Sequence, residues 1–385
     1  MGFRRGSLEG VVAVGESGQH RLTCELLASY YEGRRVLVTG STGFKGSWLC
    51  RMLANLGAEV YGYALEPPTD PSQWKIAGLD ACVRQTIADV RDLDALKSAF
   101  AEARPQAVLH LAAQPLVIDS YERPHYTYET NVMGTVNVLE CVRGCDSVTS
   151  FLNVTTDKVY ENLERPGYGY QEDDKLDGYD PYSNSKSCSE LVTHCYAKSF
   201  FAPGGYGDAA GRCAISTARA GNVIGGGDFS ANRIVPDCVR AVQTAQPIVI
   251  RNPNSVRPYQ HVLEPLVAYL GIVALQESDP AVAGWYNIGP DDKDSVTTGE
   301  LVRLFARSWG EGFSFEEGRV DGPHEANFLT LDNAKAKHVL GWRPTWGVAE
   351  AVGRTAEWTR AWLEGGNDAA TACMDKQIND YLGGL

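Results

Sequence analysis

The sequence lacks any long apolar run, and it carries less positive than negative charge. No stretch approaches the ~18–20 apolar residues that span a bilayer, so we expect no membrane partner. The short apolar run at 11–14 is followed by Glu16 and does not have the form of a signal peptide. With 35 Lys and Arg against 48 Asp and Glu, the formal charge of −13 disfavours a nucleic-acid partner.

Cysteine pairs are absent as well. None of the ten cysteines forms a Cys-x-x-Cys pair, and no group of His and Cys has the spacing of zinc ligands. The sequence therefore predicts no metal site. Most of these cysteines lie in apolar surroundings that suit a reduced thiol, so we expect the protein in the cytoplasm.

From Arg35 onwards, apolar strand patterns alternate with helical patterns. Strands are expected at 36–39, 59–64, 107–112, 150–155 and 214–219, with another ending at 88–90. Helices are expected at 45–56, 93–103, 126–144 and 181–201. Near-continuous apolar strands between helices predict a doubly wound parallel sheet, the Rossmann type of α/β fold. After Gly221 the alternation stops, and Gly225–Gly227 is expected to be a flexible loop in a smaller mixed α/β lobe.

A glycine turn connects the first strand to the first helix. Gly40 permits the tight turn, Gly43 lets the backbone approach a pyrophosphate, and Gly46 lets the helix pack closely on the strand. The same spacing arises in loops by chance, but its place between strand and helix favours a dinucleotide site. The residues assigned to cofactor binding here are Gly40, Thr42, Gly43, Phe44, Lys45 and Gly46.

The adenosine half of the cofactor has less distinct signals. Only Glu66, slightly late after the second strand, could bind the ribose hydroxyls, so this position leaves both NAD and NADP open. Asp89 and Val90 end the third expected strand and would lie beside the adenine, although Asp89 suits a surface turn equally well.

Tyr182 and Lys186 lie one helical turn apart near the start of a predicted helix. A nearby cation favours the ionised phenol, so the pair can make Tyr182 a base for a substrate hydroxyl. A Tyr-x-x-x-Lys face is common in ordinary helices and gains weight from the glycine turn upstream. Together the two motifs predict an enzyme that removes a hydride and a proton from a carbinol.

Thr156, Asp157 and Lys158 follow the fifth strand, at the sheet edge where ligands of open α/β sheets bind. Thr156 would bridge Tyr182 and a substrate hydroxyl. Asp157 and Lys158 would be an acid and a base for an elimination, although such adjacent charges also occur simply solvated in loops.

Three arginines of the second lobe, Arg233, Arg251 and Arg257, would suit phosphate oxygens. Surface solvation is the simpler role for each. We expect Arg257 at a substrate diphosphate, with Arg233 and Arg251 near it. His261 is also assigned to substrate binding, although a histidine here is more often a packed residue.

Five segments carry a more specific resemblance: residues 39–48, 63–69, 178–186, 220–228 and 257–262. They resemble the extended short-chain dehydrogenase/reductase family over roughly residues 30–360, and within it the sugar-nucleotide 4,6-dehydratases that act on CDP-glucose. The resemblance implies a lyase of deoxysugar biosynthesis, with NAD as the cofactor and CDP-glucose as the substrate.

By the same resemblance, Tyr182 would take the proton of the sugar O4 while NAD takes the hydride of C4. A base would then remove the C5 proton, Asp157 would protonate the departing C6 hydroxyl, and the hydride would return to C6. The wider dehydratases usually carry Glu at the position of Lys158. A lysine can be the C5 base only where burial or a cation lowers its pKa, and otherwise it stabilises the enolate.

The resemblance also implies supporting residues and an assembly. Asn131 would support the cofactor strand, Asn222 would contact the substrate diphosphate, and the helices at 126–144 and 181–201 would form a homodimer. The residues expected to line the cofactor, at the end of the strand expected at 107–112 and just beyond it, are Leu111, Ala112, Ala113 and Gln114.

The expected organisation has four parts. An N-terminal extension covers 1–33, and the NAD-binding domain covers 34–222 with 262–290 returning to it. The nucleotide-sugar lobe covers 223–261 and 291–360, and a C-terminal tail covers 361–385.

Two alternative functions stay open. The chain could be a nucleotide-sugar 4-epimerase or a dehydratase for another nucleotide. An epimerase needs no acid–base pair for C6, so Asp157 and Lys158 argue against it. A non-catalytic NAD-sensing protein on the same fold would not need Tyr182, Lys186 and Asp157 all intact.

Overall fold

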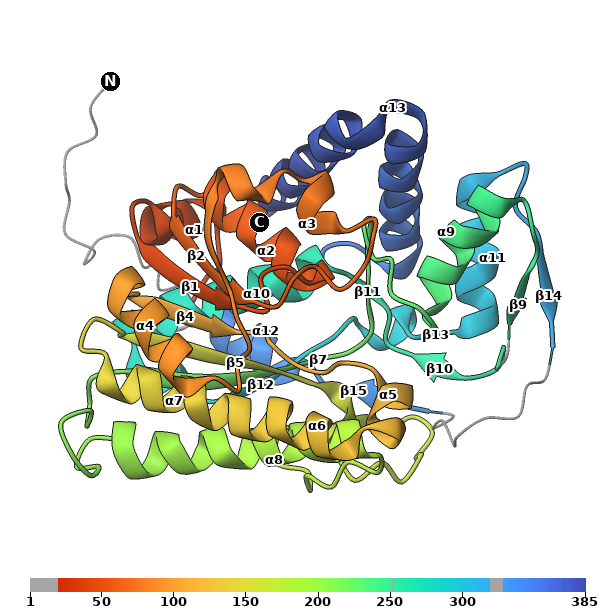
Figure 1. Ribbon diagram of the computed structural model, residues 1–385. Helices are drawn as coiled ribbons and strands as arrows, with labels where there is room; N and C mark the ends of the chain where they lie inside the picture. Colours follow the sequence, from red (N-terminus) through yellow and green to blue (C-terminus); the bar gives the residue numbers. More distant parts are fainter. Residues whose placement is uncertain (1–19, 251, 319–327) are drawn as a thin grey trace.

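The computed structural model describes residues 20–250, 252–318 and 328–385 (Figure 1). Its centre is a seven-stranded sheet with the order β12-β7-β5-β4-β1-β2-β3, in which all neighbouring strands are parallel. The strands are β1 (Arg35–Thr39), β2 (Glu59–Ala64), β3 (Val83–Ile87), β4 (Ala107–His110), β5 (Ser150–Thr156), β7 (Ala214–Ala220) and β12 (Trp285–Ile288). The predicted doubly wound α/β fold is confirmed.

Helices cover both faces of the sheet (Figure 1). One layer contains α4 (Leu93–Ala103), α6 (Pro124–Tyr128), α7 (Gly134–Gly144) and α8 (Pro181–Tyr196), with α5 (Val117–Glu122) beside it. The other contains α1 (Cys24–Tyr31), α2 (Phe44–Asn55) and α10 (Leu263–Ser278), with α3 (Gln73–Ile76) and α12 (Ala334–Leu340) at its margins. Successive residues of β1 serve opposite layers: Val36 and Val38 join the core under α2 and α10, and Leu37 joins the core under α4 and α7.

The helix α10 is apolar on every side because it is enclosed on every side. All residues from Leu263 to Gln276 are buried, and α1 covers its outer face through Leu27 and Tyr31. Tyr31 OH donates to the Leu270 carbonyl at 3.0 Å. No helix in the described part of the chain is long and apolar enough to cross a membrane.

A smaller lobe lies beside the carboxyl edge of the sheet (Figure 1). Two helices, α9 (Ile234–Thr244) and α11 (Thr298–Trp309), share a core with the start of α13 (Val348–Leu382). Short strand pairs complete the lobe and its junctions: β9 (Ile248–Ile250) with β14 (Phe315–Glu317), β10 (Val256–Arg257) with β13 (Val296–Thr297), β8 (Val223–Ile224) with β11 (Gln260–His261), and β6 (Gly169–Tyr170) with β15 (Thr330–Leu331).

Several element boundaries differ from the sequence expectation. The third strand ends at Ile87 and the fourth at His110, so the residues that follow them lie in loops. The long helix expected at 126–144 contains a π-helical turn at Glu129–Met133, and a second π turn at Ala197–Phe201 follows α8. Residues 1–19 of the expected N-terminal extension lie outside the described residues, and α1 beyond them is part of the core.

The expected loop at Gly225–Gly227 is tightly packed rather than flexible. Gly226 accepts a hydrogen bond from Trp48 Nε1 at 2.9 Å, and a Cβ on Gly226 would lie 2.1 Å from the Trp358 ring. These glycines let the backbone pass close to two indole rings. The segment is a loop as expected, but its glycines serve close packing and not flexibility.

Most of the expected C-terminal tail at 361–385 is helical, because residues 361–382 belong to the helix α13. Gly366 has φ +69 and turns the helix sharply, so its second half returns to the cofactor-side layer. Met374, Ile378 and Tyr381 are buried there, and Asp375 binds Arg51 of α2 through both carboxylate oxygens, at 2.7 and 2.5 Å.

The carboxylate of Glu264 fastens this returning helix to α10. It is fully buried and accepts hydrogen bonds from Tyr381 OH at 2.6 Å, Trp346 N at 2.6 Å and Thr345 N at 3.1 Å. Burial raises the pKa of Glu264 to about 7, although these hydrogen bonds act in the opposite direction.

This pKa predicts a pH-dependent stability. The ordinary pKa of a glutamate, 4.5, applies to Glu264 in the unfolded chain, whereas its pKa in the folded protein is about 7. Between these two pH values the unfolded chain loses the Glu264 proton while the folded protein retains it. Stability therefore falls across this interval, by about 3 kcal/mol at most. The variant Glu264→Gln removes this component, so the difference between its thermal midpoint and that of the wild type should change in the variant's favour between pH 5 and pH 7 and stay constant above pH 7.

The variant Tyr381→Phe is the matched control. It removes one hydrogen bond that lowers the Glu264 pKa and should therefore extend the interval to higher pH. Equal pH dependence in the wild type and Glu264→Gln would contradict the assignment.

Candidate active site

The predicted site residues gather where β1, β4 and β5 end. The chain runs from β1 outwards to β2 and β3 and then returns to β4 on the other side of β1. In open α/β sheets ligands usually bind at such a reversal, here outside the carboxyl ends of β1 and β4.

The glycine turn forms a cradle for a pyrophosphate group. Gly40 has φ +74, and a Cβ there would lie 2.7 Å from Ala112 N. A Cβ on Gly46 would lie 2.1 Å from the Gly40 carbonyl oxygen, whereas one on Gly43 would make only an ordinary contact at 3.4 Å. Gly43 caps α2 without a side chain, so the first amides of α2 remain for an anion. These features fit a dinucleotide cofactor.

The neighbours of the glycines fix this turn and add a charge to it. Thr42 Oγ1 donates to the Leu65 carbonyl at 2.8 Å, which ties the turn to the end of β2. Phe44 starts α2. Lys45 Nζ donates to Tyr269 OH at 3.4 Å, and burial lowers the pKa of Lys45 to about 7, with Arg233 and Lys186 adding to the effect.

The loop after β4 is held by side chains. Thr39 Oγ1 accepts from Leu111 N and Ala112 N, both at 3.2 Å. Asn131, in the π turn, accepts from Gln114 N at 2.8 Å and donates to the Gln114 carbonyl at 3.1 Å and to Ser185 Oγ at 2.8 Å. Asn131 therefore couples residues 111–114, including Ala113, to the helix α8.

The expected adenine residues have partners within the protein. The carboxylate of Asp89 accepts from the Arg91 guanidinium at 2.8 Å, and this hydrogen bond lowers the pKa of Asp89. Val90 packs on Gly134 of α7, where a Cβ would lie 2.7 Å from its side chain. The Gln114 side chain turns to Thr127 and Leu116.

The start of α8 presents Tyr182 and Lys186. Asp180 caps the helix by accepting from Ser183 N at 2.9 Å, and Pro181 starts it, so Tyr182 lies in the first turn. Burial raises the pKa of Tyr182 to about 12, while the hydrogen bond to Thr156 and the charge of Arg233 act to lower it. Lys186 Nζ donates to the Val154 carbonyl at 3.2 Å.

The acid and base expected at the end of β5 lie in a short 3-10 turn, Asp157–Val159. Asp157 is buried, accepts from Thr156 Oγ1 at 2.9 Å and from Lys158 Nζ at 3.4 Å, and keeps Oδ2 without a hydrogen bond. Lys158 Nζ also donates to Asn222 Oδ1 at 3.4 Å. A buried carboxylate oxygen aimed at no protein group is suited to a substrate proton.

The five residues assigned to substrate binding are not equivalent: Asn222, Arg233, Arg251, Arg257 and His261. Arg233 pairs with Asp228 at 3.6 Å and acts electrostatically on Tyr182 and Lys45. Arg257 is buried in β10 and donates to the Val256 carbonyl at 2.9 Å. Arg251 lies outside the described residues.

His261 is enclosed by aromatic neighbours in this structure. It is fully buried, with the Trp48 and Trp346 rings 5.7 and 5.0 Å away, and burial lowers its pKa to about 3. The substrate role expected for His261 therefore has no geometric basis. The packed role, the simpler one for a histidine between apolar segments, describes it correctly.

Two residues that the sequence analysis did not single out belong to the same region. Glu190 of α8 and Arg219 of β7 form a fully buried ion pair, with 3.0 Å between Arg219 Nη2 and Glu190 Oε2. Thr155 contacts this pair through Glu190. Glu190 follows Lys186 by four residues, a spacing visible in the sequence, but nothing in the sequence indicates that β7 brings Arg219 to it.

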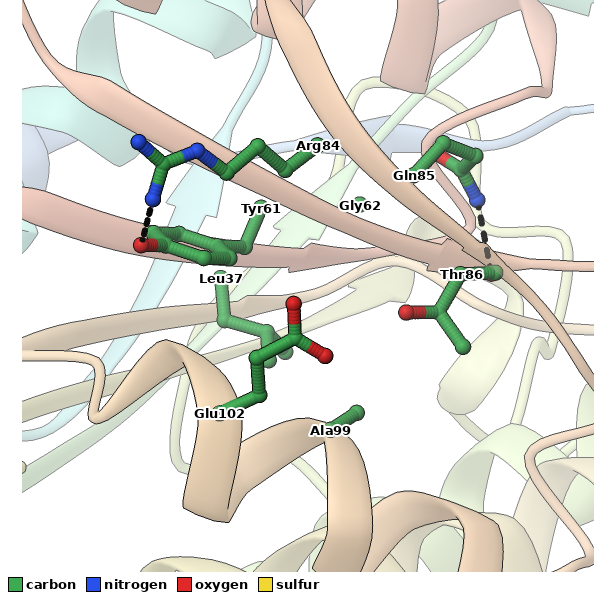
Figure 2. A pocket seen from close by; sticks show the side chains of 8 residues that line it. All are labelled: Leu37, Tyr61, Gly62, Arg84, Gln85, Thr86, Ala99 and Glu102. Carbon is green, nitrogen blue, oxygen red and sulfur yellow. Dashed lines mark hydrogen bonds between the residues drawn. The ribbon is translucent and has the colours of Figure 1, made fainter.

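One described cavity contains none of the predicted residues (Figure 2). It lies between β2, β3 and α4, with Arg84 donating to Tyr61 OH at 2.5 Å on one side and Glu102 on the other. Its lining comes from the middle of the strands, away from the carboxyl edge. Among the described residues, no three His, Cys, Asp or Glu side chains are placed to hold a metal ion.

A glycine turn and a Tyr-x-x-x-Lys helix at one sheet edge define an enzyme of the extended short-chain dehydrogenase/reductase class. A family profile described as GDP-mannose 4,6 dehydratase matches residues 37–355. The chain belongs to this dehydratase family, and the family resemblance seen in the sequence is confirmed.

Individual relatives agree with this. A CDP-glucose 4,6-dehydratase of Salmonella typhimurium is 44% identical over 92% of this chain and 98% of its own length. A dTDP-glucose 4,6-dehydratase of Streptomyces antibioticus is 29% identical over 86% of this chain and 94% of its own. Among solved structures, the UDP-glucose 4-epimerase of Thermus thermophilus in complex with NAD superposes on this chain with a TM-score of 0.70. The two chains are 26% identical, and the match covers 85% of this chain and 99% of the epimerase chain.

The contacts that a Cβ would make at Gly46 and at Gly43 predict different effects of an alanine at the two positions. Gly46→Ala places a Cβ against backbone, so it should lower the thermal midpoint even without cofactor. Gly43→Ala makes only an ordinary contact at a φ of −72, so it should leave the unliganded midpoint near that of the wild type. Its methyl group enters the anion cradle, and the rise in midpoint caused by added NAD should shrink or vanish.

Thermal melts of both variants with and without NAD test this distinction. A Gly43→Ala variant that keeps the full cofactor-induced rise would show that the cradle does not hold the pyrophosphate.

Proposed function

We propose that this protein is a CDP-glucose 4,6-dehydratase, which converts CDP-glucose to CDP-4-keto-6-deoxyglucose and water with NAD as the cofactor. The buried Asp157 beside Lys158 and Thr156 is the observation that carries the proposal. Oxidation and reduction at C4 alone need only the tyrosine and lysine, whereas loss of the C6 hydroxyl also needs a proton donor at that position. The 44% identity to the Salmonella enzyme supports CDP-glucose as the substrate.

The cofactor would lie along the glycine turn. Gly40, Gly43 and Gly46 fit its pyrophosphate, and residues 111–114 would line its nicotinamide half. When bound, NAD supplies a hydride acceptor and later returns that hydride to the same sugar, so the net reaction is a dehydration. The turn and the charge of Lys45 would be kept in place by Thr42, Phe44 and Lys45.

The chain's own groups would move the protons. Tyr182, bound to Thr156, takes the O4 proton, and Asp157 Oδ2 gives a proton to the departing C6 hydroxyl. Lys158 lies on the same turn, where it removes the C5 proton or stabilises the enolate. Asn222, Arg233 and Arg257 would hold the diphosphate, and the pairing of Lys158 with Asn222 would bring sugar and diphosphate sites together.

We further propose a homodimer and a cytoplasmic location. α7 and α8 lie side by side on the outer face of the sheet (Figure 1), and Met133 and Leu191 expose 51% and 55% of their surface there. Such apolar exposure suits a helix-to-helix contact between two copies. All ten cysteines are free thiols in the structure, which suits a reducing compartment.

The decisive experiment uses CDP-glucose in heavy water, with the product analysed by mass spectrometry and NMR. The proposal predicts loss of one water and gain of one deuterium at C5, because the C5 proton exchanges with solvent while the hydride returns internally. A sugar nucleotide of unchanged formula but inverted C4 would identify an epimerase. No change with CDP-glucose, together with dehydration of UDP-, dTDP- or GDP-glucose or GDP-mannose, would assign another nucleotide.

The role of Lys158 can be separated from that of Tyr182. Lys158→Met removes the ammonium from the turn but leaves Tyr182, Thr156 and the cofactor residues in place. We expect absorbance of reduced nicotinamide to accumulate after CDP-glucose is added, while water loss falls by about 100-fold or more. Rapid mixing and product analysis measure both quantities on the same sample.

Asn222→Ala is the matched control, because it removes the neutral partner of Lys158 and retains its charge. It should weaken turnover without trapping the reduced cofactor. Full turnover by Lys158→Met would exclude a direct part for Lys158 in the elimination.

A further inference from the structure

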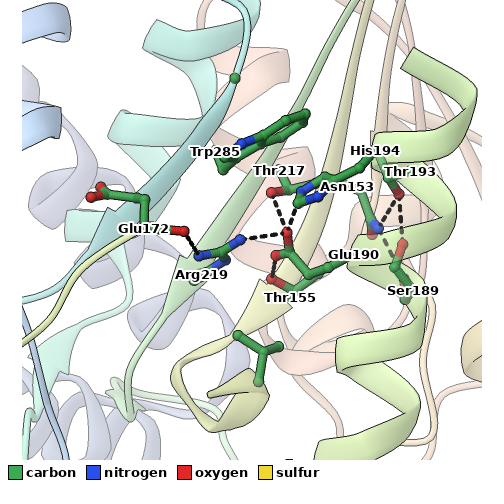
Figure 3. Close-up of polar contacts among 12 residues, drawn as sticks. Asn153, Thr155, Glu172, Ser189, Glu190, Thr193, His194, Thr217, Arg219 and Trp285 are labelled. Atoms are coloured by element: carbon green, nitrogen blue, oxygen red, sulfur yellow. Dashed lines mark hydrogen bonds and ion pairs between the residues drawn. The ribbon is translucent and has the colours of Figure 1, made fainter. Parts of the chain in front are cut away.

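A cluster of polar groups surrounds Glu190 between the helix α8 and the strands β5 and β7 (Figure 3). Its centre is Glu190 of α8, whose side chain is fully buried. One carboxylate oxygen accepts from Thr155 Oγ1 at 2.5 Å. The other accepts from Thr217 Oγ1 at 2.7 Å, Arg219 Nη2 at 3.0 Å and His194 Nε2 at 3.1 Å. Four donors from β5, β7 and α8 thus converge on one carboxylate.

Arg219 extends this cluster to the segment that follows the catalytic turn. Its Nη1 donates to Tyr160 OH at 2.7 Å and to the Glu172 carbonyl at 2.9 Å. Tyr160 in turn donates to Asn287 Oδ1 at 2.6 Å. The ion pair therefore joins α8, the end of β5, the segment after the 3-10 turn and β12.

Glu190 and Lys186 are neighbours on the helix α8. The two residues are one turn apart on α8 and so lie on the same face of the helix. Thr155, which binds Glu190, immediately precedes Thr156 of the proposed site. Among the described residues Lys186 forms no direct ion pair, and its ammonium donates only to the Val154 carbonyl.

We propose that Glu190 is a positioning residue, which keeps the buried Lys186 ammonium charged and fixes α8 against the end of β5. This inference rests on the proposed function, since it assigns Glu190 a part in the dehydration through Lys186. Replacing a buried ion pair by apolar packing of the same volume is often neutral for stability, so such a pair leaves room for a role besides folding.

The charges around Lys186 make such a group necessary. Burial lowers the pKa of Lys186 to about 8, and Glu190 opposes that effect. The other titratable groups in its surroundings are Tyr182 on α8, Lys45 on α2 and His110 on β4, and burial lowers the pKa of His110 to about 3. Asp157, after β5, acts electrostatically on Tyr182 and Lys45 and is paired with Lys158 at 3.4 Å. Tyr182, Lys45 and His110 supply no negative charge at neutral pH, whereas Arg219 and hydrogen bonds hold the pKa of Glu190 at about 2 against its burial.

These charges fix the direction in which the Lys186 pKa should move when Glu190 is replaced. Removal of the Glu190 charge favours neutral Lys186, so the Lys186 pKa should fall by about one pH unit in Glu190→Gln. The alkaline limb of the kcat profile for CDP-glucose should move to lower pH by the same amount. A merely structural role would lower kcat at every pH and leave the limb in place.

Glu190→Asp is the conservative variant, because it retains the charge but shortens the reach to Thr155 and Thr217. It should lose rate and stability while its alkaline limb stays near that of the wild type. An alkaline limb that moves equally in Glu190→Asp and Glu190→Gln would overturn the charge argument.

A direct titration makes the test independent of turnover. The protein is labelled with carbon-13 lysine, and the Lys186 Cε resonance is assigned by its disappearance in Lys186→Arg. Its titration midpoint should fall in Glu190→Gln and stay in Glu190→Asp, and an unchanged midpoint in Glu190→Gln would overturn the proposal. If the wild type does not act on CDP-glucose, the proposed function fails while this titration still decides the role of Glu190.

Glu190→Gln leaves Arg219 without its carboxylate and can fail to fold for that reason. Arg219→Met then provides the opposite change, since the carboxylate stays and its compensating cation is lost. The Lys186 midpoint should rise in this variant, and a fall or no change would contradict the inference.

Discussion

The uniform direction of the seven central strands is the constraint on which the site depends. Because all of them run parallel, their carboxyl ends meet at one edge, and groups distant in the chain arrive there together. The glycine turn follows β1, and the turn that contains Asp157 follows β5. The loop at 111–114, which is held by Asn131, follows β4. The helix α8 crosses behind them and brings Tyr182 to the same place. A single antiparallel strand at β1 or β5 would remove its loop from this edge.

The parts of this arrangement that depend on short spacings could be predicted from the sequence. A glycine turn is a local backbone requirement, and a Tyr-x-x-x-Lys pair is a local property of one helix. Strand and helix periodicity likewise predicted the doubly wound sheet, which the structure confirms. The dehydratase family was recognisable because its segments combine these local requirements in a fixed order, and the match over residues 37–355 bears it out.

The features that depend on distant partners could not be predicted. Gly226 looked like a flexible loop residue because the sequence does not show that Trp48 and Trp358 pack on its backbone. His261 looked available to a substrate for the same reason, since Trp346, which helps to enclose it, comes far later in the chain. The Glu190 ion pair needs β7 beside β5, a neighbour relation that no local pattern encodes.

The return of α13 after Gly366 has a consequence for how the protein is made. The cofactor helix α2 is among the first elements to leave the ribosome, yet its partner Asp375 is among the last. The helix α10 and the edge strand β12 also arrive late, although they complete the layer over β1 and the sheet itself. The packing around the dinucleotide unit is therefore complete only after nearly the whole chain has been translated, so the unit is not built from one continuous N-terminal segment.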